Sequence, residues 1–466
     1  MSAEAALTAF STRKLSPVEF MTAIIDRVER LDAEVNALPI RFFEPALAAA
    51  GAAEKRYMGR GQRPRPLEGL PVAVKDDIPI AGQPWTMGSL VYRDRIADET
   101  APVGERVIES GAIIHARSTM PEFAMLDTTF SRLWGVTRNP WNLSLGPGGS
   151  SGGSAAALAA GLTTLAVGSD IGGSIRMPAA FCGLIGYKPP YGRVPLPTND
   201  NFTHYQHHGP IGRTVGDVRL LENAIAGPHP RDALTVRPKV TIPARLPGIK
   251  GWRIALSIDL GGYTVADEVR HHTMNVAEWL TQAGASVNLV TLKWSPDEVA
   301  EACAAHYALL WHCRPPDDAD RDLFSHYVVD VLDGYRAPDP ISFRNALAAE
   351  NRAYLDLARI FADHRVLVCP TYGMTGIPAE LAHTDGGYHV DGNEVDPSSV
   401  LLTAPFNMCS RCPVLSVPSG IAGNGLPTGV QIVGPTYDDV SVFRVAASLQ
   451  QRYALFESPT LRPALI

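Results

Sequence analysis

The sequence predicts an α/β/α fold, in which a central sheet is covered by helices on both faces. The main observation is that strand-like and helix-like patterns alternate along the chain, as in sheets packed between helices. Residues 252–258, 264–283 and 286–290 read as a strand, a helix and a strand, which together form a β-α-β unit. Residues 413–418 and 429–434 return to strand-like patterns near the end of the chain. We expect all 466 residues, 1–466, to form a single domain.

The first predicted element is a helix that begins after Ser16. Ser16-Pro17-Val18-Glu19 fits a capping box with proline at the first helical position. Apolar residues then recur at helical spacing up to Leu31. A short apolar strand follows at 70–75 and ends in a lysine, Lys75, just before two aspartates. We assign the helix to packing and keep the lysine as a candidate for chemistry.

Two further segments have a distinct character. Residues from about 296 to 365 are mostly helical and read as an insert. The segment 384–399 is rich in glycine and aspartate, which favours a surface hairpin or a lid. Such loops shape a pocket, but they carry no readable code for its substrate.

The composition excludes several function classes. The chain is 45% hydrophobic and 19% charged, its net charge is −7, and it has no basic block, which disfavours nucleic acid and anionic membranes as partners. The longest small-apolar stretch, 155–167, is too short to span a bilayer, and the N-terminus lacks a signal pattern. We therefore expect a cytoplasmic protein with no membrane segment, and its oligomeric state, including a homodimer, stays open.

Cysteine and histidine usage argues against a metal or other cofactor. Six scattered cysteines do not make a disulfide framework, and Cys409-x-x-Cys412 lacks the second pair of a zinc site. His204, His207 and His208 cluster, but no carboxylate or cysteine completes a ligand set in that loop. We expect buried free thiols, no cofactor, and a structural or pocket-rim role for the histidines.

Two glycine–serine loops, 146–153 and 169–174, are the most informative feature. The first loop, 146–153, does not match a phosphate-binding loop, because Ser154 occupies the position at which that motif requires a lysine. It also satisfies the G-x-S-x-G pattern of a nucleophile elbow, yet the polar, proline-bearing residues 139–147 precede it where a buried strand is required. An α/β-hydrolase-type esterase is therefore an alternative with the wrong local context.

A mechanism in which a lysine activates a serine would use the lysine at the end of the strand and both glycine–serine loops. A serine hydroxyl needs a base to remove its proton, and a buried lysine can serve because burial disfavours its charged form. Lys75 lies where a strand would bury it, although for a lysine considered by itself a surface pair with Asp76 or Asp77 is the favoured explanation, because buried lysines are rare. Gly172-Gly173-Ser174 could direct backbone N–H groups at one point ahead of a serine, although a tight turn explains the glycines alone.

The runs Gly148–Ser154 and Gly168–Ala179 resemble the amidase signature. Ser150 and Ser174 lie 24 residues apart, as the two catalytic serines do in that family, and Val74-Lys75-Asp76 matches the family's lysine strand. Four shorter segments are also similar to the family, so the likeness covers nearly the whole chain: 120–123, 138–142, 183–189 and 426–434. The resemblance implies a mixed central sheet and a signature core at about 70–220.

The resemblance also implies roles for individual residues. Ser174 would be the nucleophile, and Ser150, after a cis peptide bond from Gly149, would relay its proton to Lys75. The backbone N–H groups of Ile171, Gly172, Gly173 and Ser174 would form the oxyanion hole, a feature worth about 3–4 kcal/mol per donor. Ser151, Asp170 and Arg176 would support the lysine and the loop. Separately, Ala124, Met125 and Gly149 are candidates for binding the substrate, the first two as lining of an apolar acyl pocket.

The expected activity is that of an amidohydrolase, forming an acyl-enzyme from small, uncharged, fairly apolar amides, anilides or carbamates, with side activity on esters. The alternative within the family is the A-type component of a tRNA-dependent amidotransferase, which must recognise the charged end of glutamine. By resemblance that component would carry an acidic residue around Val400, where this chain is apolar. The amidotransferase therefore remains a second hypothesis.

Overall fold

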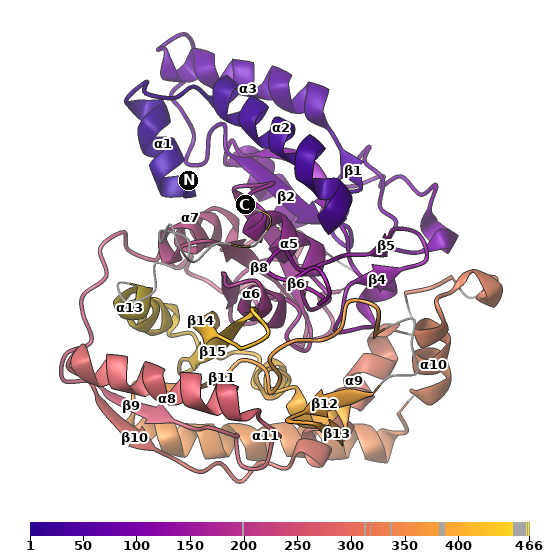
Figure 1. The fold of residues 1–466 in the computed structure, drawn as a ribbon, viewed down its shortest axis with the longest axis vertical. Helices are drawn as coiled ribbons and strands as arrows, with labels where there is room; N and C mark the ends of the chain where they lie inside the picture. The colour runs from indigo at the N-terminus through magenta and orange to yellow at the C-terminus, as the bar shows by residue number, and fades with distance from the viewer. Residues whose placement is uncertain are drawn as a thin grey trace.

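The computed structural model describes residues 1–197, 200–311, 314–316, 318–335, 338–381, 387–450, 463 and 465. Figure 1 shows the N-terminal helices on one side of the molecule and the helices of its second half on the other. Within the described residues, no helix is both long and apolar enough to cross a membrane.

An eleven-stranded sheet runs through the described part of the molecule. In spatial order its strands are β1 (Ile40–Arg41), β3 (Ile113–Ser118), β2 (Pro71–Lys75), β6 (Leu165–Asp170), β8 (His207–Gly212), β7 (Ile185–Lys188), β14 (Val414–Ile421), β15 (Pro427–Val433), β11 (Val366–Pro370), β9 (Arg253–Leu256) and β10 (Ser286–Leu289). β2 is parallel to β3 and β6, and β9 is parallel to β10 and β11. The strands between these two groups pair antiparallel, so the sheet is mixed, as predicted.

The helices are α1 (Ala3–Ser11), α2 (Pro17–Val35), α3 (Phe43–Tyr57), α4 (Pro102–Glu109), α5 (Gly152–Ala159), α6 (Arg176–Phe181), α7 (Val215–Ile225), α8 (Asp267–Gln282), α9 (Pro296–Trp311), α10 (His326–Gly334), α11 (Pro340–Asp363), α12 (Pro405–Met408) and α13 (Asp439–Gln450). α2 begins with the predicted capping box: the N–H of Glu19 donates to the Ser16 hydroxyl, and the Glu19 carboxylate accepts from the N–H of Ser16. The segment 252–290 forms the predicted β-α-β unit, β9-α8-β10, with parallel strands.

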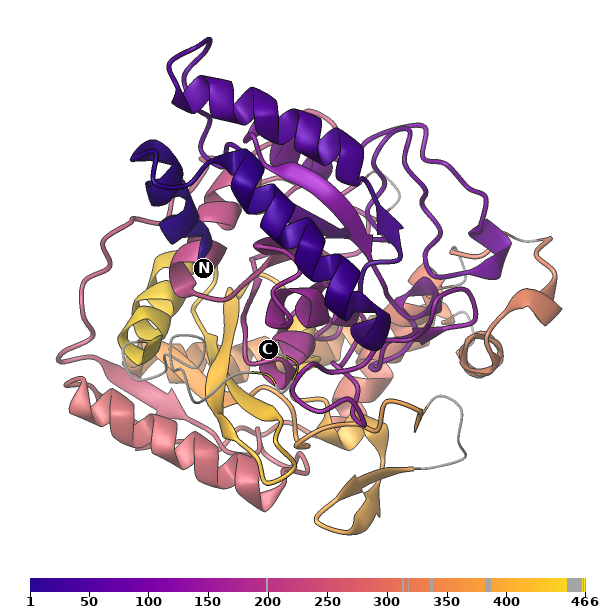
Figure 2. The same ribbon diagram turned by 45° about the horizontal axis from the view of Figure 1, so that its top comes forward.

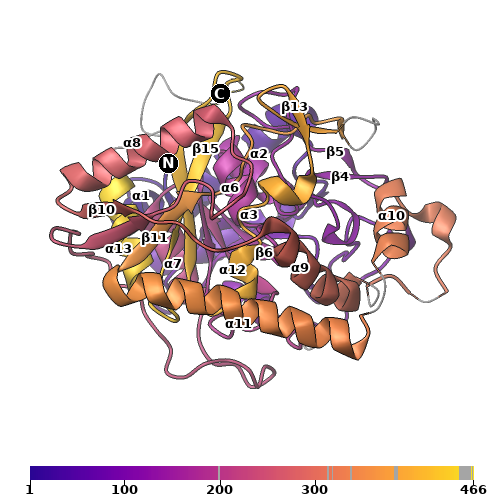
Figure 3. The same ribbon diagram turned by 90° about the horizontal axis from the view of Figure 1, so that it is seen from below.

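Side chains alternate across the sheet, so each strand contributes to a core on both faces. On β11, Val366 and Val368 pack in a cluster with residues of α8 and α13. Leu367 and Cys369 point to the other face and join a cluster with residues of α9 and α11. Figure 3 shows α8 and α11 on opposite sides of these strands. The prediction of helices on both faces is confirmed.

The first half of the sheet is covered in the same way. Val72 and Val74 of β2 pack with residues of α1 and α4, whereas Ala73 packs with the alanines of α5. Because α5 carries mainly alanine, glycine and serine, its backbone can lie close to β2 and β6, and all its residues are buried. α2 and α3 lie side by side at the N-terminal edge (Figures 1 and 2).

A glycine marks the junction between α5 and β6. The apolar run continues directly from α5, yet β6 spans only Leu165–Asp170. Gly161 takes a left-handed conformation with φ of 72°, and the N–H of Leu162 donates back to the carbonyl of Ala157 (2.7 Å). These bonds are typical of a glycine that ends a helix. Residues 160–162 therefore close α5, and the strand begins later.

Two other segments frame the site. The described residues of 296–365 form α9, α10, α11 and a short 3-10 turn at Arg321–Leu323. Within 384–399, β12 (Tyr388–Val390) and β13 (Asn393–Val395) pair as an antiparallel hairpin, while residues 382–386 lie outside the described residues. The minor strands β4 (Phe130–Ser131) and β5 (Gly135–Val136) pair with each other. Cys182, Cys303, Cys369, Cys409 and Cys412 are free and buried, and Cys313 lies outside the described residues.

Candidate active site

Lys75 and Ser150 meet at the carboxyl end of β2. The Nζ of Lys75 donates a hydrogen bond to the Oγ of Ser150 (2.7 Å), although 75 positions separate them in the chain. Ser150 follows a cis peptide bond from Gly149, as the resemblance implies. Gly149 has no room for a side chain, because a Cβ there would lie 2.7 Å from the carbonyl oxygen of Leu126.

Lys75 is completely buried, and its closest anion is Asp77. Its Nζ lies 3.2 Å from Oδ2 of Asp77, which is also buried. Burial lowers the pKa of Lys75, because the ammonium form loses its hydration, and the Asp77 carboxylate opposes this effect. The net direction is downward, so the proton of Lys75 is held less tightly than that of a lysine in water. The alternative of a surface ion pair is wrong in its location: the pair is present, but it lies in the interior.

Ser169 is a site residue that sequence reasoning missed. It is the residue before Asp170 at the end of β6, and its hydroxyl accepts a second hydrogen bond from Lys75 Nζ (2.7 Å). The same hydroxyl donates to Oδ2 of Asp77. Ser169 therefore joins the lysine to the aspartate, and Lys75 is fixed between Ser150 on one side and the Ser169–Asp77 pair on the other.

Ser151 holds the two glycine–serine loops together. Its backbone N–H donates to the carbonyl of Ser174 (3.1 Å), and its hydroxyl donates to the carbonyl of Ser169 (3.1 Å). The Ser169 N–H in turn donates to the Ser151 hydroxyl (3.3 Å). These bonds place Ser150 and Ser174 on neighbouring segments.

Asp170 and Arg176 anchor the loop that carries Ser174. The Asp170 carboxylate accepts from the backbone N–H of Gly173 (2.9 Å) and of Ile175 (3.2 Å), and it pairs with the buried Arg176 guanidinium (2.9 Å). Burial alone would raise the pKa of Asp170, but Arg176 and the hydrogen bonds hold it well below its usual range. Arg176 also donates to groups from the second half of the chain: the carbonyl of Thr403, Gln431 Oε1 and Asn407 Oδ1.

The backbone of 171–174 is held from outside the loop as well. Tyr307 of α9 donates its hydroxyl to the carbonyl of Ile171 (3.2 Å), and Thr403 donates to the carbonyl of Gly172 (2.6 Å). These two hydrogen bonds to backbone carbonyls restrain the turn. Gly172 and Ser174 within it are partly exposed. Since the N–H of Gly173 donates to Asp170, Ile171, Gly172 and Ser174 remain the expected donors to an oxyanion.

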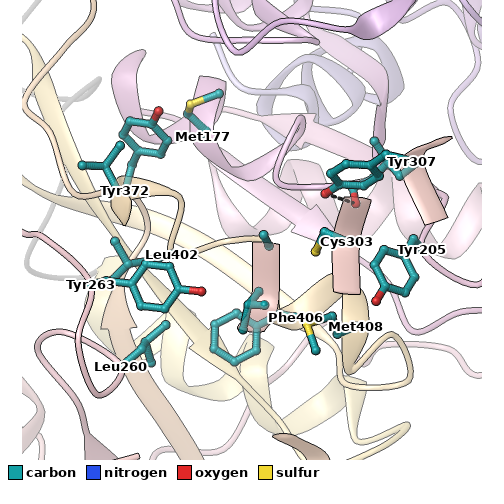
Figure 4. Packing of buried hydrophobic residues seen from close by; sticks show 14 of the residues in the cluster. Met177, Tyr205, Leu260, Tyr263, Cys303, Tyr307, Tyr372, Leu402, Phe406 and Met408 are labelled. Atoms are coloured by element: carbon teal, nitrogen blue, oxygen red, sulfur yellow. Dashed lines mark hydrogen bonds between the residues drawn. The ribbon is translucent and has the colours of Figure 1, made fainter. Parts of the chain in front are cut away.

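A largely apolar cavity of about 350 Å³ opens over Ser174. Its wall includes the predicted residues Ala124, Met125, Gly149 and the whole of 171–174. It also includes residues that the sequence did not indicate, from α9 and from 397–404, among them Cys303, Tyr307, Trp311 and Leu401. Figure 4 shows part of this wall, with Met177, Tyr263, Cys303 and Tyr307 among the labelled side chains.

The three clustered histidines, His204, His207 and His208, lie in two different environments. His207 and His208 lie in β8, where burial lowers the pKa of both rings. His204 instead lies beside His306 of α9 and Glu350 of α11. The nitrogen and oxygen atoms of these side chains that could bind a metal ion lie within 4.8 Å of one another. The segment of the histidines contains no carboxylate, and Glu350, which lies far along the chain, provides one beside His204. Glu350 also accepts from the Tyr205 hydroxyl (3.0 Å), so hydrogen bonds already bind this cluster together.

The chain is similar to known proteins over nearly its whole length. Residues 19–443 match the model of the Amidase family. The chain is 33% identical to the A-type component of the glutamyl-tRNA(Gln) amidotransferase of Acidothermus cellulolyticus, over 95% of this chain and 92% of the relative. It is 30% identical to an acylamidase of Rhodococcus erythropolis, over 97% and 95%. Its structure resembles that of a bacterial aryl acylamidase with a TM-score of 0.89 and 27% identity, covering 97% of this chain and 96% of the other.

Proposed function

This chain belongs to the amidase family and is a hydrolase of amide C–N bonds, and on that premise we propose that Ser174 is its nucleophile. The observation that carries the proposal is the contact between Lys75 and Ser150 beside the loop of Ser174. Neutral Lys75 would take the proton of Ser150, and Ser150 would take that of Ser174 as its hydroxyl attacks the amide carbon.

The carbonyl oxygen becomes negative during the attack. The backbone N–H groups of Ile171, Gly172 and Ser174 would stabilise it, and Asp170 with Arg176 would hold the loop in place. Lys75 would return the proton through Ser150 to the leaving amine, which leaves an acyl ester on Ser174. Water would then attack the ester, and its proton would pass through Ser150 to Lys75 and back to the Ser174 oxygen as the carboxylic acid is released.

The cavity supports small and fairly apolar substrates. Its wall is mainly aliphatic and aromatic, so burial of an apolar acyl or aryl group would provide most of the binding free energy. We propose amides, anilides or carbamates, with side activity on esters. The single-domain organisation, the cytoplasmic location and a homodimer belong to the same proposal.

Relatives at 33% identity make the A-type component of an amidotransferase the second candidate. That activity needs a partner for the α-carboxylate of glutamine, yet the described residues of the cavity wall include neither lysine nor arginine. Hydrolysis of glutamine by the isolated chain, or activity that requires a partner protein, would favour this candidate over the amidohydrolase.

The test is the Ser174→Ala variant with a p-nitroanilide substrate. We expect kcat to fall at least about a thousandfold, as when the nucleophile of other serine hydrolases is removed. Acid-quenched wild-type enzyme should gain the mass of the acyl group, and the variant should not. Ser144→Ala, an exposed serine near the first loop, is the matched control and should retain its rate. Undiminished turnover by Ser174→Ala would overturn the assignment.

A further inference from the structure

One ionisable carboxyl group lies in the otherwise uncharged wall of the cavity. Among the described residues that line the cavity, Asp127 alone is charged, and the rest are apolar, aromatic or small. No ion pair within the described part of the chain joins Asp127 to a lysine, arginine or histidine. Among the described residues, the acidic group in the candidate substrate pocket therefore has no basic partner.

Two tyrosines hold this carboxyl in place. The hydroxyl of Tyr372 donates to Oδ2 (2.7 Å), and the hydroxyl of Tyr388 in β12 donates to Oδ1. Tyr388 also lines the cavity, and Tyr372 is among the labelled side chains in Figure 4. Burial raises the pKa of Asp127, and the two hydroxyls, which stabilise the ionised form, offset only part of this rise. Each oxygen of a carboxylate keeps a second lone pair for another donor.

The segment of Asp127 lies against the backbone that precedes Ser150. A Cβ on Gly149 would meet the carbonyl carbon of Asp127 at 2.8 Å and the nitrogen of Thr128 at 2.9 Å. Asp127, Gly149 and Ser174 all line the same cavity. A substrate that fills this cavity with its amide at Ser174 would therefore also have Asp127 within the same cavity wall.

We propose that Asp127 binds a protonated amine of the substrate, so that the enzyme selects amides with an apolar body and one cationic amino group. The proposal rests on the function proposed above, and it adds a cationic amine to the small, fairly apolar substrates proposed there. Its physical reason is charge compensation, because a carboxylate removed from water is costly until a cation or further donors meet it. An ammonium group supplies both a positive charge and three donors.

The test compares two p-nitroanilides of equal size, one with an ω-aminopentanoyl group and one with a hexanoyl group. They differ only by an ammonium in place of a methyl group. A second pair carries the same exchange on the aniline side, because the amine could belong to the leaving group. We expect the wild-type enzyme to prefer the amine in at least one pair. In Asp127→Asn, which keeps the side-chain shape, that preference should fall about tenfold or more in kcat/KM.

The matched control is Asp391→Asn. Asp391 lies in the turn of the same hairpin as Tyr388, is exposed and does not line the cavity, so the substitution removes the same charge without touching the wall. It should leave both preferences unchanged. If Asp127→Asn changes neither preference, or if the wild-type enzyme favours the methyl member of both pairs, the amine proposal is overturned. Loss of hydrolysis in Ser174→Ala shows separately that the proposed function stands, whatever the outcome for Asp127.

Discussion

Oδ2 of Asp77 lies 3.2 Å from Nζ of Lys75, and the two side chains are only 4% and 0% exposed. The pair combines two opposing requirements of the proposed mechanism. To accept a proton from Ser150, Lys75 must be neutral, which burial favours, and the ammonium group that then forms must be stabilised, which the Asp77 carboxylate does. Asp77 raises the pKa of Lys75 toward its ordinary value, while burial pulls it down further than Asp77 restores. In the proposed mechanism, this balance would determine the pH at which the enzyme becomes active.

Replacing Asp77 with asparagine should shift the acidic limb of the pH–rate profile to lower pH. Without the carboxylate the ammonium form of Lys75 loses a stabilising charge, so its pKa falls further and the lysine is neutral at lower pH. We expect a shift of about one pH unit or more in kcat/KM, since one unit corresponds to about 1.4 kcal/mol. The rate at the plateau should also fall, because a weaker base accepts the proton less readily.

Asp76→Asn is the matched control for this experiment. Asp76 is the buried neighbour of Asp77, but its carboxylate accepts from Thr86 and from the N–H of Gly88. Its replacement should lower stability and leave the acidic limb in place. An acidic limb that stays fixed, or moves to higher pH, in Asp77→Asn would contradict Lys75 as the titrating base.

The residues predicted from the sequence are those that the spacing of motifs reveals. Lys75, Ser150 and Ser174 were predicted together because three motifs occur at family spacing. Ser169 was missed because a serine next to a glycine has no pattern of its own, and its role depends on the position of Asp77 in the turn after β2. The pairing of His204 with Glu350 was missed for a similar reason, because α11 supplies the carboxylate. Such contacts depend on tertiary packing, which a single sequence does not encode locally.

The fold, too, has features that local sequence patterns predict and others that depend on tertiary packing. Hydrophobic periodicity predicted the alternation of strands and helices and the β9-α8-β10 unit. It did not predict that β7 lies between β8 and β14, or that β11 joins β9 to β15. These pairings bring together strands that are far apart in the chain. They also bring Gln431 and Asn407 to Arg176, so the loop of Ser174 is held by residues more than 200 positions away.

Replacing Arg176 with methionine should destabilise the protein and disable the loop. The change leaves Asp170 buried without its cation, which typically costs about 3–5 kcal/mol in the free energy of unfolding. Urea denaturation measures this loss. In the folded fraction, determined by circular dichroism, we also expect a lower kcat, because Asp170 would no longer hold the N–H groups of Gly173 and Ile175 in place.

A second buried ion pair provides the control. Arg193 pairs with Asp439 (2.8 Å), with exposed fractions of 4% and 1%. Neither residue lines the cavity. Arg193→Met should therefore destabilise the protein by a similar amount, while its folded fraction keeps the kcat of the wild-type enzyme. If the two variants lose kcat equally, Arg176 contributes to stability alone.

Replacing Gly173 with alanine tests the oxyanion loop directly. Gly173 has a φ of 131°, which favours glycine, and an added Cβ would lie 2.0 Å from the hydroxyl of Thr403. That hydroxyl holds the carbonyl of Gly172, so the loop must shift to make room. Loss of a single oxyanion donor typically costs about 10²–10³ in kcat, and we expect a fall of that order with little change in KM.

Gly392→Ala is the matched control: its φ of 83° is also left-handed, but nothing lies within 4 Å of the added Cβ. That variant should lose about 1–2 kcal/mol of stability through backbone strain and keep its kcat. A fully active Gly173→Ala enzyme would mean that stabilisation of the oxyanion does not depend on the geometry of this loop.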